Sequence, residues 1–358
     1  MRQHRIAAIG GDGIGPEVIA AGCRVLDATA AAEGGFAFQV TPFDWGSDYY
    51  RRTGRMMPED GLAQLAPFDA IFFGAVGDRA IPDHITLWEL RLAICQGFDQ
   101  YANVRPTRLL PGISGPLKDA LGAQIDWVIV RENSEGEYAG VGGRAHRGLS
   151  LEVAMDVAVF TREGVARIAR FACDLAMSRP RRMLTVVTKS NAQRHGMVLW
   201  DEVIAGVTAQ YPDLTIDKML VDAMAARMVV RPGSVDTVLA TNLHADILSD
   251  LASACAGSLG IGATANIDPT RRNPSMFEPI HGSAFDIVGR GIANPLGAFW
   301  TGAMLLEHLG EAAAARRLMR AIEAVTARGV ALTPDLGGTA TTEDTTLAVI
   351  AALAGTNA

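Results

Sequence analysis

Cysteines, long apolar runs and excess positive charge are all scarce in this chain of 358 residues. Its four cysteines are scattered and form no C-x-x-C pair, which argues against a disulfide framework or a cysteine zinc site and indicates reduced thiols in a cytoplasmic protein. No stretch reaches the ~18–20 continuous apolar residues of a membrane span, and glycines interrupt the apolar start, so we expect neither a signal peptide nor a membrane anchor. The formal net charge of −7 argues against broad nucleic-acid binding, so an anionic substrate needs a local basic site.

The segments that are present alternate between strand-like and helix-like patterns. Apolar residues make up 49% of the chain, enough for two domains or one long α/β unit. The alternation indicates an α/β protein with a largely parallel sheet, and no internal repeat is visible. The predicted strands are 5–9, 70–73, 127–130, 184–187 and 235–240. The predicted helices are 16–32, 161–177, 198–209, 298–309 and 311–328.

A glycine-rich turn follows the first predicted strand. Gly11 and Gly13 supply two glycines of the G-x-G-x-x-G dinucleotide fingerprint, but the third position falls on Pro16. No G-K-[ST] follows, so the turn is not a phosphate-binding P-loop, which argues against a nucleotide-dependent kinase. Two interpretations stay open, a tight strand-to-helix turn and a close approach of the backbone to a ligand.

Two aspartates, Asp246 and Asp250, follow the strand-like run 235–240. Their i,i+4 spacing puts both carboxylates on one helix face, where they repel each other unless a cation lies between them. Carboxylate oxygens suit a hard divalent ion such as Mg²⁺ or Mn²⁺, although such a pair can also be a solvated helix face. Asp222 follows another apolar pair and is a candidate third carboxylate, or an ordinary turn residue.

Cationic and phenolic side chains occur near the ends of other predicted strands. Arg131 ends the run 127–130 and Tyr138 lies in the polar loop beyond it, where ligands gather in α/β folds. Arg105 precedes a proline and therefore lies on extended backbone; guanidinium groups such as these bind carboxylates bidentately. Lys189 ends a further strand run and is either a surface lysine or, near a metal, a base with a lowered pKa.

A polar loop from Glu278 to Asp286 offers His, Gly and Ser donors. It could hold a nucleotide, with Asp286 accepting hydrogen bonds from ribose hydroxyls. The alternative is a structural turn held by Pro279 and Gly282.

Taken together and in order, these motifs resemble the metal-dependent β-decarboxylating dehydrogenases, the isocitrate/isopropylmalate dehydrogenase family. The likeness runs nearly end to end, and it is finest to the tartrate/D-malate dehydrogenase branch. The motifs that carry it are Gly11-Asp12-Gly13-Ile14-Gly15-Pro16-Glu17, Asn103-Val104-Arg105-Pro106, Arg131-Glu132-Asn133-Ser134-Glu135-Gly136, Lys189-Ser190-Asn191, Asp246-Ile247-Leu248-Ser249-Asp250 and Glu278-Pro279-Ile280-His281-Gly282-Ser283-Ala284. The branch likeness rests on Phe98-Asp99-Gln100-Tyr101, Leu109-Leu110-Pro111-Gly112 and His84-Ile85-Thr86-Leu87-Trp88.

The resemblance implies the family's own two-domain α/β fold with a large mixed, mostly parallel sheet, which is not a Rossmann domain. Residues 1–105 and 258–358 would form a discontinuous cofactor-binding domain. Residues 106–257 would form a middle domain with the dimer interface and a projecting arm near 142–153. The active site would lie in the cleft of a homodimer, with Lys189 and Asp222 reaching the partner's site.

The resemblance also assigns roles to individual residues. Arg105 and Arg131 match the arginines that bind the substrate carboxylates, Tyr138 the proton donor and Lys189 the catalytic lysine. The metal ligands, for Mg²⁺ or Mn²⁺, would be Asp222, Asp246 and Asp250. The cofactor loop would be Glu278, His281, Gly282, Ser283, Ala284, Asp286 and Asn294. An acid at Asp286 repels a 2′-phosphate, so NAD is expected rather than NADP; K⁺ is a further candidate cofactor.

One position departs from the family pattern. Relatives usually have an arginine ten residues before the Arg105 equivalent, where this chain has Cys95. Arg91 lies one helical turn earlier and could reach the substrate carboxylate that the missing arginine would bind. Alternatively, the substrate could differ from that of the relatives. The segment 88–92, where the family reads the C3 substituent, carries Trp88 and this cation. A branched alkyl group would desolvate Arg91, so we expect poor activity on 3-isopropylmalate.

The sequence therefore predicts an NAD- and Mg²⁺/Mn²⁺-dependent oxidative decarboxylase of a malate- or tartrate-like (2R)-2-hydroxy acid with a β-carboxylate. The nearest alternative is a 3-isopropylmalate dehydrogenase of leucine synthesis. Another is a weakened paralogue that binds metabolite and nucleotide without turnover. Two further departures are His244, which we interpret as a packing residue, and Phe285, where relatives have proline.

Overall fold

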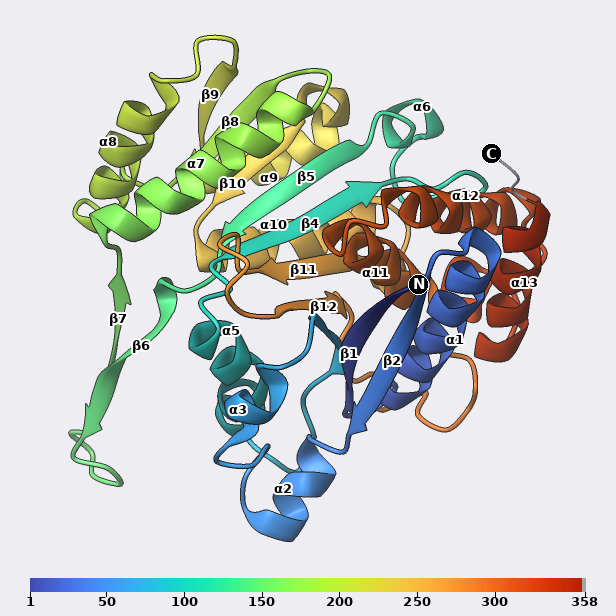
Figure 1. Ribbon diagram of the computed structural model, residues 1–358. Helices are drawn as coiled ribbons and strands as arrows, with labels where there is room; N and C mark the ends of the chain where they lie inside the picture. Colours follow the sequence, from blue (N-terminus) through green and yellow to red (C-terminus); the bar gives the residue numbers. More distant parts are fainter. Residues whose placement is uncertain (356–358) are drawn as a thin grey trace.

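The computed structural model describes residues 1–355 and shows one ten-stranded mixed sheet running through the molecule (Figure 1). The strand order is β2-β1-β3-β12-β11-β4-β5-β10-β8-β9. Both outer parts of the sheet are parallel, while the central strands β12, β11, β4 and β5 pair antiparallel. The predicted α/β fold with a large, mostly parallel sheet is confirmed.

The elements follow the chain in an order typical of crossover connections in α/β proteins. The strands are β1 (Arg2–Gly11), β2 (Phe36–Phe43), β3 (Ala70–Ala75), β4 (Ala102–Arg108), β5 (Asp126–Glu132), β6 (Gly136–Ala145), β7 (Val153–Val159), β8 (Met183–Thr188), β9 (Thr215–Leu220), β10 (Thr237–Ala240), β11 (Ala263–Ile267) and β12 (Ser275–Pro279). The α-helices are α1 (Gly15–Glu33), α2 (Ser47–Thr53), α3 (Gly61–Leu65), α4 (Asp83–Thr86), α5 (Ala93–Gly97), α6 (Asp119–Gly122), α7 (Arg162–Ser178), α8 (Gly196–Thr208), α9 (Val221–Val230), α10 (Asn242–Cys255), α11 (Leu296–His308), α12 (Ala312–Arg328) and α13 (Thr342–Gly355). A π-helical turn, η1 (Leu87–Leu92), joins α4 to α5, and short 3₁₀ turns are η2 (Pro232–Ser234), η3 (Leu259–Ile261) and η4 (Pro334–Leu336).

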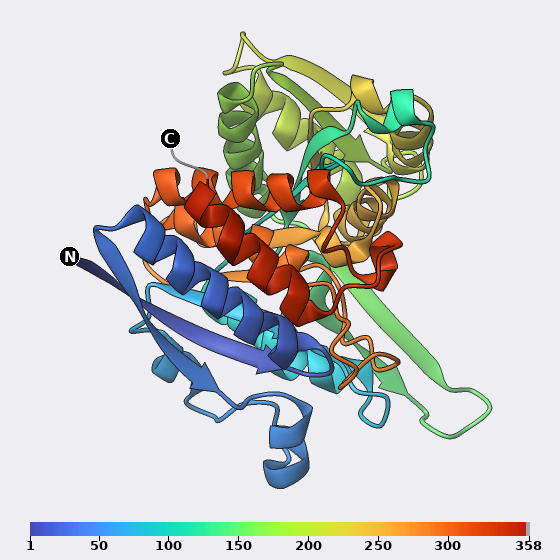
Figure 2. The ribbon, with the colours of Figure 1, turned by 90° about the vertical axis from the view of Figure 1, so that its right-hand side faces the viewer.

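Helices cover both faces of the sheet, with a different set on each half. Around β1, β3 and β12, one face packs on α1, α11, α12 and α13, and the other on α2, α3, η1 and α5 (Figures 1 and 2). Around β5, β8 and β10, α7 and α8 cover one face and α9 and α10 the other. The inner strands β3 and β10 are almost wholly apolar because they are buried on both faces.

The apolar clusters are distributed along the chain much as the predicted domain division suggests. The largest cluster takes residues from 6–113 and 261–353, while the second and third take theirs from 101–255. The sheet nevertheless continues through both regions by way of β11, β4 and β5. The boundaries at 105 and 258 therefore stay a prediction.

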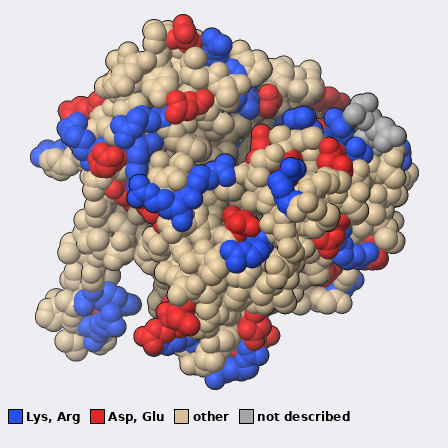
Figure 3. Space-filling model, in the orientation of Figure 1, with Lys and Arg blue, Asp and Glu red and all other residues tan. Residues whose placement is uncertain are grey.

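Two strands leave the body of the molecule. β6 and β7 pair antiparallel as a separate two-stranded ribbon that projects from the body (Figures 1 and 2). Its outer part is solvent-exposed, including the apolar side chains of Leu149, Leu151 and Met155. Basic and acidic side chains occur side by side over the face of the body that Figure 3 shows. Among the described residues, no helix is long and apolar enough to cross a membrane.

Candidate active site

The predicted arginine, tyrosine and carboxylate side chains meet at one cavity of about 250 Å³. The neighbouring central strands β4 and β5 contribute Arg105 and Arg131, and the first residues of β6 contribute Tyr138. The helix α10 contributes Asp246 and Asp250, one turn apart. Strand pairing thus brings together side chains that the sequence only places at separate strand ends.

Both arginines are buried and directed at the same carboxylate. The guanidinium of Arg131 donates from Nη1 to Asp246 and from Nε to Asn242 Oδ1 at 2.9 Å. Arg105 donates from Nη1 to Ser249 Oγ at 2.5 Å, and its Nη2 lies 3.6 Å from Asp246 Oδ1. Asn242 and Ser249 were not among the predicted site residues, although both lie on α10 within or beside the aspartate motif.

The charges in the cavity alter the pKa values of its acids and bases. Burial alone would raise the pKa of Asp246, but Arg131 and Arg105 together hold it below its ordinary value. Burial, and then repulsion from Asp246, raises the pKa of Asp250. Burial and the neighbouring Arg131 lower the pKa of Arg105 to about 10, which still leaves it charged at neutral pH. A nearby cation would therefore stabilise the ionised form of Asp250.

Arg91 also lines the cavity, and it is held by a buried carboxylate. Its Nε and Nη2 lie 2.8 and 2.7 Å from Glu278 Oε1, and Asn266 donates to the same oxygen at 2.7 Å. Burial works against the charge on Arg91, but Glu278 outweighs it and raises the arginine pKa. Cys95 lies beside this pair, and burial raises its pKa to about 11, so it is a neutral thiol. Arg91 therefore reaches the cavity, as it must if it replaces the arginine that relatives have at the position of Cys95. It is, however, already in an ion pair with Glu278.

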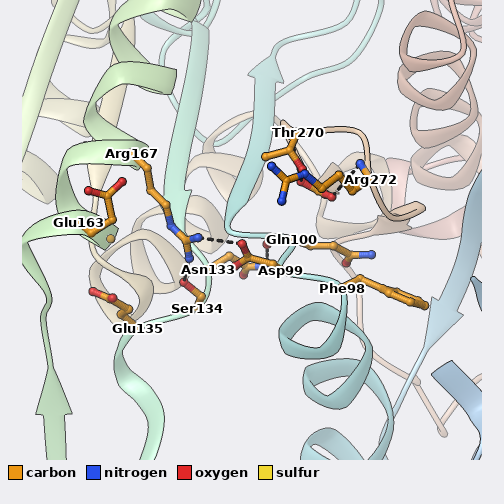
Figure 4. A network of polar contacts seen from close by, with 12 residues as sticks. Phe98, Asp99, Gln100, Asn133, Ser134, Glu135, Glu163, Arg167, Thr270 and Arg272 are labelled. Atoms are coloured by element: carbon orange, nitrogen blue, oxygen red, sulfur yellow. Dashed lines mark hydrogen bonds and ion pairs between the residues drawn. The ribbon is translucent and has the colours of Figure 1, made fainter. Parts of the chain in front are cut away.

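The loop that carries Tyr138 is anchored at its start. The buried Glu132 accepts from the backbone N–H groups of Ser134 at 3.0 Å and Glu135 at 2.7 Å. Arg167 on α7 donates to Ser134 Oγ at 2.9 Å and to Asp99 Oδ2 at 2.8 Å, which ties the loop to the segment before β4 (Figure 4). These contacts fix the turn that sends the chain from β5 into β6.

Two predicted residues lie outside the cavity and contact each other. Lys189, just after β8, forms an ion pair with Asp222 in the first turn of α9. The lysine lowers the pKa of the aspartate through this hydrogen bond. The Asp222 side chain is 65% exposed. Among the described residues, no cluster of three or more His, Cys, Asp or Glu side chains could hold a metal. In one chain, therefore, Asp222 does not join Asp246 and Asp250.

The predicted cofactor loop extends from this cavity into a second one. His281 and Gly282 line the first cavity, while Ser283 and Ala284 line an adjoining cavity of about 610 Å³ together with Phe285. His281 Nε2 and Ser283 Oγ are buried without a hydrogen-bond partner among the described residues. A bound ligand or water would satisfy such atoms, and a polar nucleotide fits this loop.

Two members of the predicted cofactor set lie differently. Asp286 is exposed and lines neither cavity. Asn294 is buried, with Oδ1 accepting from Leu296 N at 2.9 Å and Nδ2 donating to Asp335 Oδ2 at 2.8 Å. Its amide is therefore already engaged in holding the start of α11. Their roles toward a nucleotide stay predictions.

The glycine-rich turn packs against the same loop. Ile14 donates its backbone N–H to Ser283 O at 2.9 Å, and Gly13 has φ +60° with no room for a Cβ beside that carbonyl. Asp12 accepts from Ser47 N at 2.6 Å and Gly77 N at 2.9 Å. The turn thus supports the wall of the cofactor cavity, and the tight-turn interpretation accounts for its glycines.

The donor set fits a divalent metal ion in charge as well as in chemistry. Three arginines and three carboxylates line the first cavity, so their formal charges cancel. One divalent ion would leave the cavity with two positive charges, which matches a dicarboxylate substrate. Asp246 and Asp250 supply oxygen ligands of the kind that Mg²⁺ and Mn²⁺ prefer.

The chain resembles known proteins over nearly its whole length. The isocitrate/isopropylmalate dehydrogenases match the chain over residues 5–350. The chain belongs to the isocitrate/isopropylmalate dehydrogenase family. The chain is 67% identical, over 100% of its length and 99% of the relative, to a probable tartrate dehydrogenase/decarboxylase of Agrobacterium vitis. It is 49% identical, over 96% of each chain, to the decarboxylating D-malate dehydrogenase of Escherichia coli. A crystal structure of isocitrate dehydrogenase from Methylococcus capsulatus superposes with a TM-score of 0.88 at 34% identity, over 98% of this chain and 99% of that one.

These relatives confirm the predicted family and its tartrate/D-malate branch. As a member of the isocitrate/isopropylmalate dehydrogenases, the chain is a decarboxylating dehydrogenase.

The family likeness alone did not reveal a layer of hydrogen-bonded polar side chains beneath the arginines. Its members are Asn103, Asn133, Thr264 and Asn266. Asn103 and Asn133 were inside quoted motifs, but no spacing rule marks Asn266, which only strand pairing brings to them.

Proposed function

We propose that the protein catalyses the NAD-dependent oxidative decarboxylation of a malate- or tartrate-like (2R)-2-hydroxy acid with a β-carboxylate, using Mg²⁺ or Mn²⁺. The observation that supports this most is the cavity itself, which is lined by Arg91, Arg105 and Arg131 with Asp246 and Asp250. The names of the relatives, a tartrate dehydrogenase/decarboxylase and a D-malate dehydrogenase, agree with this substrate class.

The side chains of this cavity suit the separate steps of the reaction. Arg105 and Arg131 would bind the substrate carboxylates through charge-assisted hydrogen bonds. Tyr138, with its ring beneath the Arg131 guanidinium at 5.2 Å, would deliver a proton to C3 after the β-carboxylate leaves as CO₂. A divalent ion at Asp246 and Asp250 would stabilise negative charge on the C2 oxygen. NAD in the adjoining cavity would supply the hydride acceptor.

We further propose that a homodimer completes the site. Lys189 and Asp222 lie outside the cavity of their own chain, yet the reaction needs a base for the C2 hydroxyl. Ile247, between the two α10 aspartates, is 56% exposed, and Val230 on α9 is exposed as well. A second copy that covers this apolar surface would bury both residues and could bring its Lys189 and Asp222 to Asp246 and Asp250.

Arg91 argues against 3-isopropylmalate as the substrate. Its Nε and Nη2 are taken by Glu278, which leaves Nη1 for the cavity. A branched alkyl group against that nitrogen would desolvate a cation without replacing its hydrogen bonds, which is unfavourable. A hydrogen, a hydroxyl or a small polar group at C3 does not carry this cost.

A substrate panel tests the proposal. Purified protein is incubated with NAD⁺ or NADP⁺, Mn²⁺ and K⁺, and with D-malate, each tartrate isomer, 3-isopropylmalate or isocitrate, while NADH or NADPH absorbance is followed. We expect turnover of D-malate or a tartrate with NAD⁺, loss of activity in EDTA, and weak or no activity on 3-isopropylmalate. Turnover of 3-isopropylmalate alone would refute the substrate class, and no turnover at all would favour a binding protein.

A further inference from the structure

The backbone around Tyr138 is not held by the β-ribbon that contains it. β6 pairs with β7 at Gly136 and again from Val141 onward, and the register shifts between these points. Tyr138 therefore lies in an irregular stretch where the ladder does not fix its position. A proton donor must lie within hydrogen-bond reach of the atom it protonates, so some other contact has to hold it.

Two residues of the neighbouring elements η1 and α5 contact this stretch of backbone. Gln96 on α5 donates from Nε2 to the backbone O of Tyr138 at 3.2 Å. Trp88 on η1 packs against Gly140, where a Cβ would lie 2.8 and 3.0 Å from two atoms of the indole ring. Gly140 has φ +72°, so a glycine is needed there both for its backbone and for the indole.

The π-helical turn η1, which carries Trp88, also supplies Arg91. Leu87 and Arg91 of η1 line the cavity, while Trp88 of the same turn faces the base of the ribbon. A π-helical turn is uncommon and frequently marks a functional site. The turn η1 thus supplies a cation to the cavity and also packs against the backbone two residues beyond Tyr138.

We propose that Trp88 and Gln96 are positioning residues that hold Tyr138 for stereospecific protonation of C3. This inference rests on the proposed function. Neither side chain lines the cavity, so in the segment 88–92 Arg91 faces the substrate side and Trp88 does not. Trp88 and Gln96 instead act through the backbone from Tyr138 to Gly140. When they are removed, the arginines still bind the substrate and the C2 hydride is still transferred. The enol left after CO₂ departs is then protonated in part by water, on either face, because Tyr138 is displaced.

The test follows the stereochemistry at C3 in Trp88→Ala and Gln96→Met. Reactions run in D₂O with a tartrate isomer give a CHD–OH carbon, whose configuration is read by NMR after immediate enzymatic reduction of the product. If wild type uses only D-malate, D-malate with a single deuterium placed stereospecifically at C3 gives a chiral CHDT methyl group in tritiated water instead. Glu89→Gln, on the exposed side of η1, is the matched control.

We expect wild type and Glu89→Gln to yield one configuration, and the two variants to yield a mixture. For Gln96→Met, which loses a single hydrogen bond, kcat should fall about three- to tenfold while KM changes less than about twofold. If both variants keep a single configuration and the wild-type kcat, the positioning role is refuted even though the proposed function stands. If wild type turns over no hydroxy acid, the proposed function itself has failed. Gln96→Met removes no buried volume, so it remains informative if Trp88→Ala misfolds.

Discussion

Replacing Arg91 with leucine separates two roles that this arginine has in the cavity. Arg91 and Glu278 are 8% and 5% exposed, so the change leaves a buried carboxylate whose remaining hydrogen-bond donor among residues 1–355 is Asn266, at 2.7 Å. Removing one partner of a buried ion pair costs about 3–5 kcal/mol of stability. Because the amide of Asn266 still donates, we expect the lower end, about 3 kcal/mol.

The effect of the same change on activity has a different origin. If Nη1 of Arg91 binds the substrate, its loss removes a charge-assisted hydrogen bond of about 1.5–3 kcal/mol. That corresponds to roughly a 10- to 150-fold fall in kcat/KM, at about 1.4 kcal/mol per factor of ten. The loss should be specific to the substrate, with the KM for NAD⁺ nearly unchanged.

Two measurements separate these effects. Urea unfolding gives the stability, and the double variant Arg91→Leu/Glu278→Gln should recover most of it, because no buried charge is then unpaired. The rate of NADH formation, measured at urea concentrations well below the unfolding transition, gives kcat/KM for the substrate that the substrate panel identifies. The control Arg52→Leu removes an exposed ion pair with Asp44 and should change stability by less than about 1 kcal/mol. An Arg91→Leu enzyme with full kcat/KM would refute substrate contact by Arg91, whatever its stability.

Three further results are expected. Lys189→Met and Tyr138→Phe should each be far less active than wild type. Mixed subunits should regain about a quarter of wild-type activity, since half the dimers are hybrids with one intact site; no recovery after proven subunit exchange would exclude a shared site. Asp250→Asn should weaken Mn²⁺ binding, measured by electron paramagnetic resonance, at least about tenfold, and unchanged affinity would remove Asp250 from the ligand set. Burial, then Arg271, lowers the pKa of His308 from 6.5 to about 4, so the unfolded chain binds a proton first and stability falls as pH drops from 6.5 towards 4. About 1–2 kcal/mol should be lost by pH 5, and urea titrations of His308→Gln should show a smaller loss than wild type.

The sequence predicted most of the elements that are buried on both faces. Continuous apolar runs marked β3, β5 and β8, helical spacing marked α7 and α11, and alanine-rich composition marked α12, each within a few residues of its observed bounds. It did not reveal β9, β11 or β12 as strands. β9 is partly exposed and carries charged residues, and the other two are short and contain polar side chains that hydrogen-bond inside the sheet. Local apolar pattern cannot identify such strands, because their pairing partners are distant in the chain.

In the site, too, the residues that local sequence patterns mark were predicted, and the contacts between distant residues were not. Arg131 was marked by its place at a strand end, and Asp246 and Asp250 by helical spacing. The buried pair of Arg91 and Glu278 was not predicted as a pair, since 187 residues separate them. The sequence indicated the type of chemistry at each position, whereas the identity of each hydrogen-bond partner depended on the order of strands in the sheet.

Lys189 and Asp222 mark the limit of what any single chain can reveal. The motif Lys189-Ser190-Asn191 is as clear in the sequence as that of Asp246, yet Lys189 meets Asp222 and not the cavity. A motif records that a residue is needed for the chemistry, but not which copy of the chain uses it. The proposal of a shared site draws on the exposed Ile247 beside Asp246, because a second copy of the chain that covered this side chain would bury its apolar surface. The argument for a shared site therefore comes from an apolar residue with no chemical role of its own.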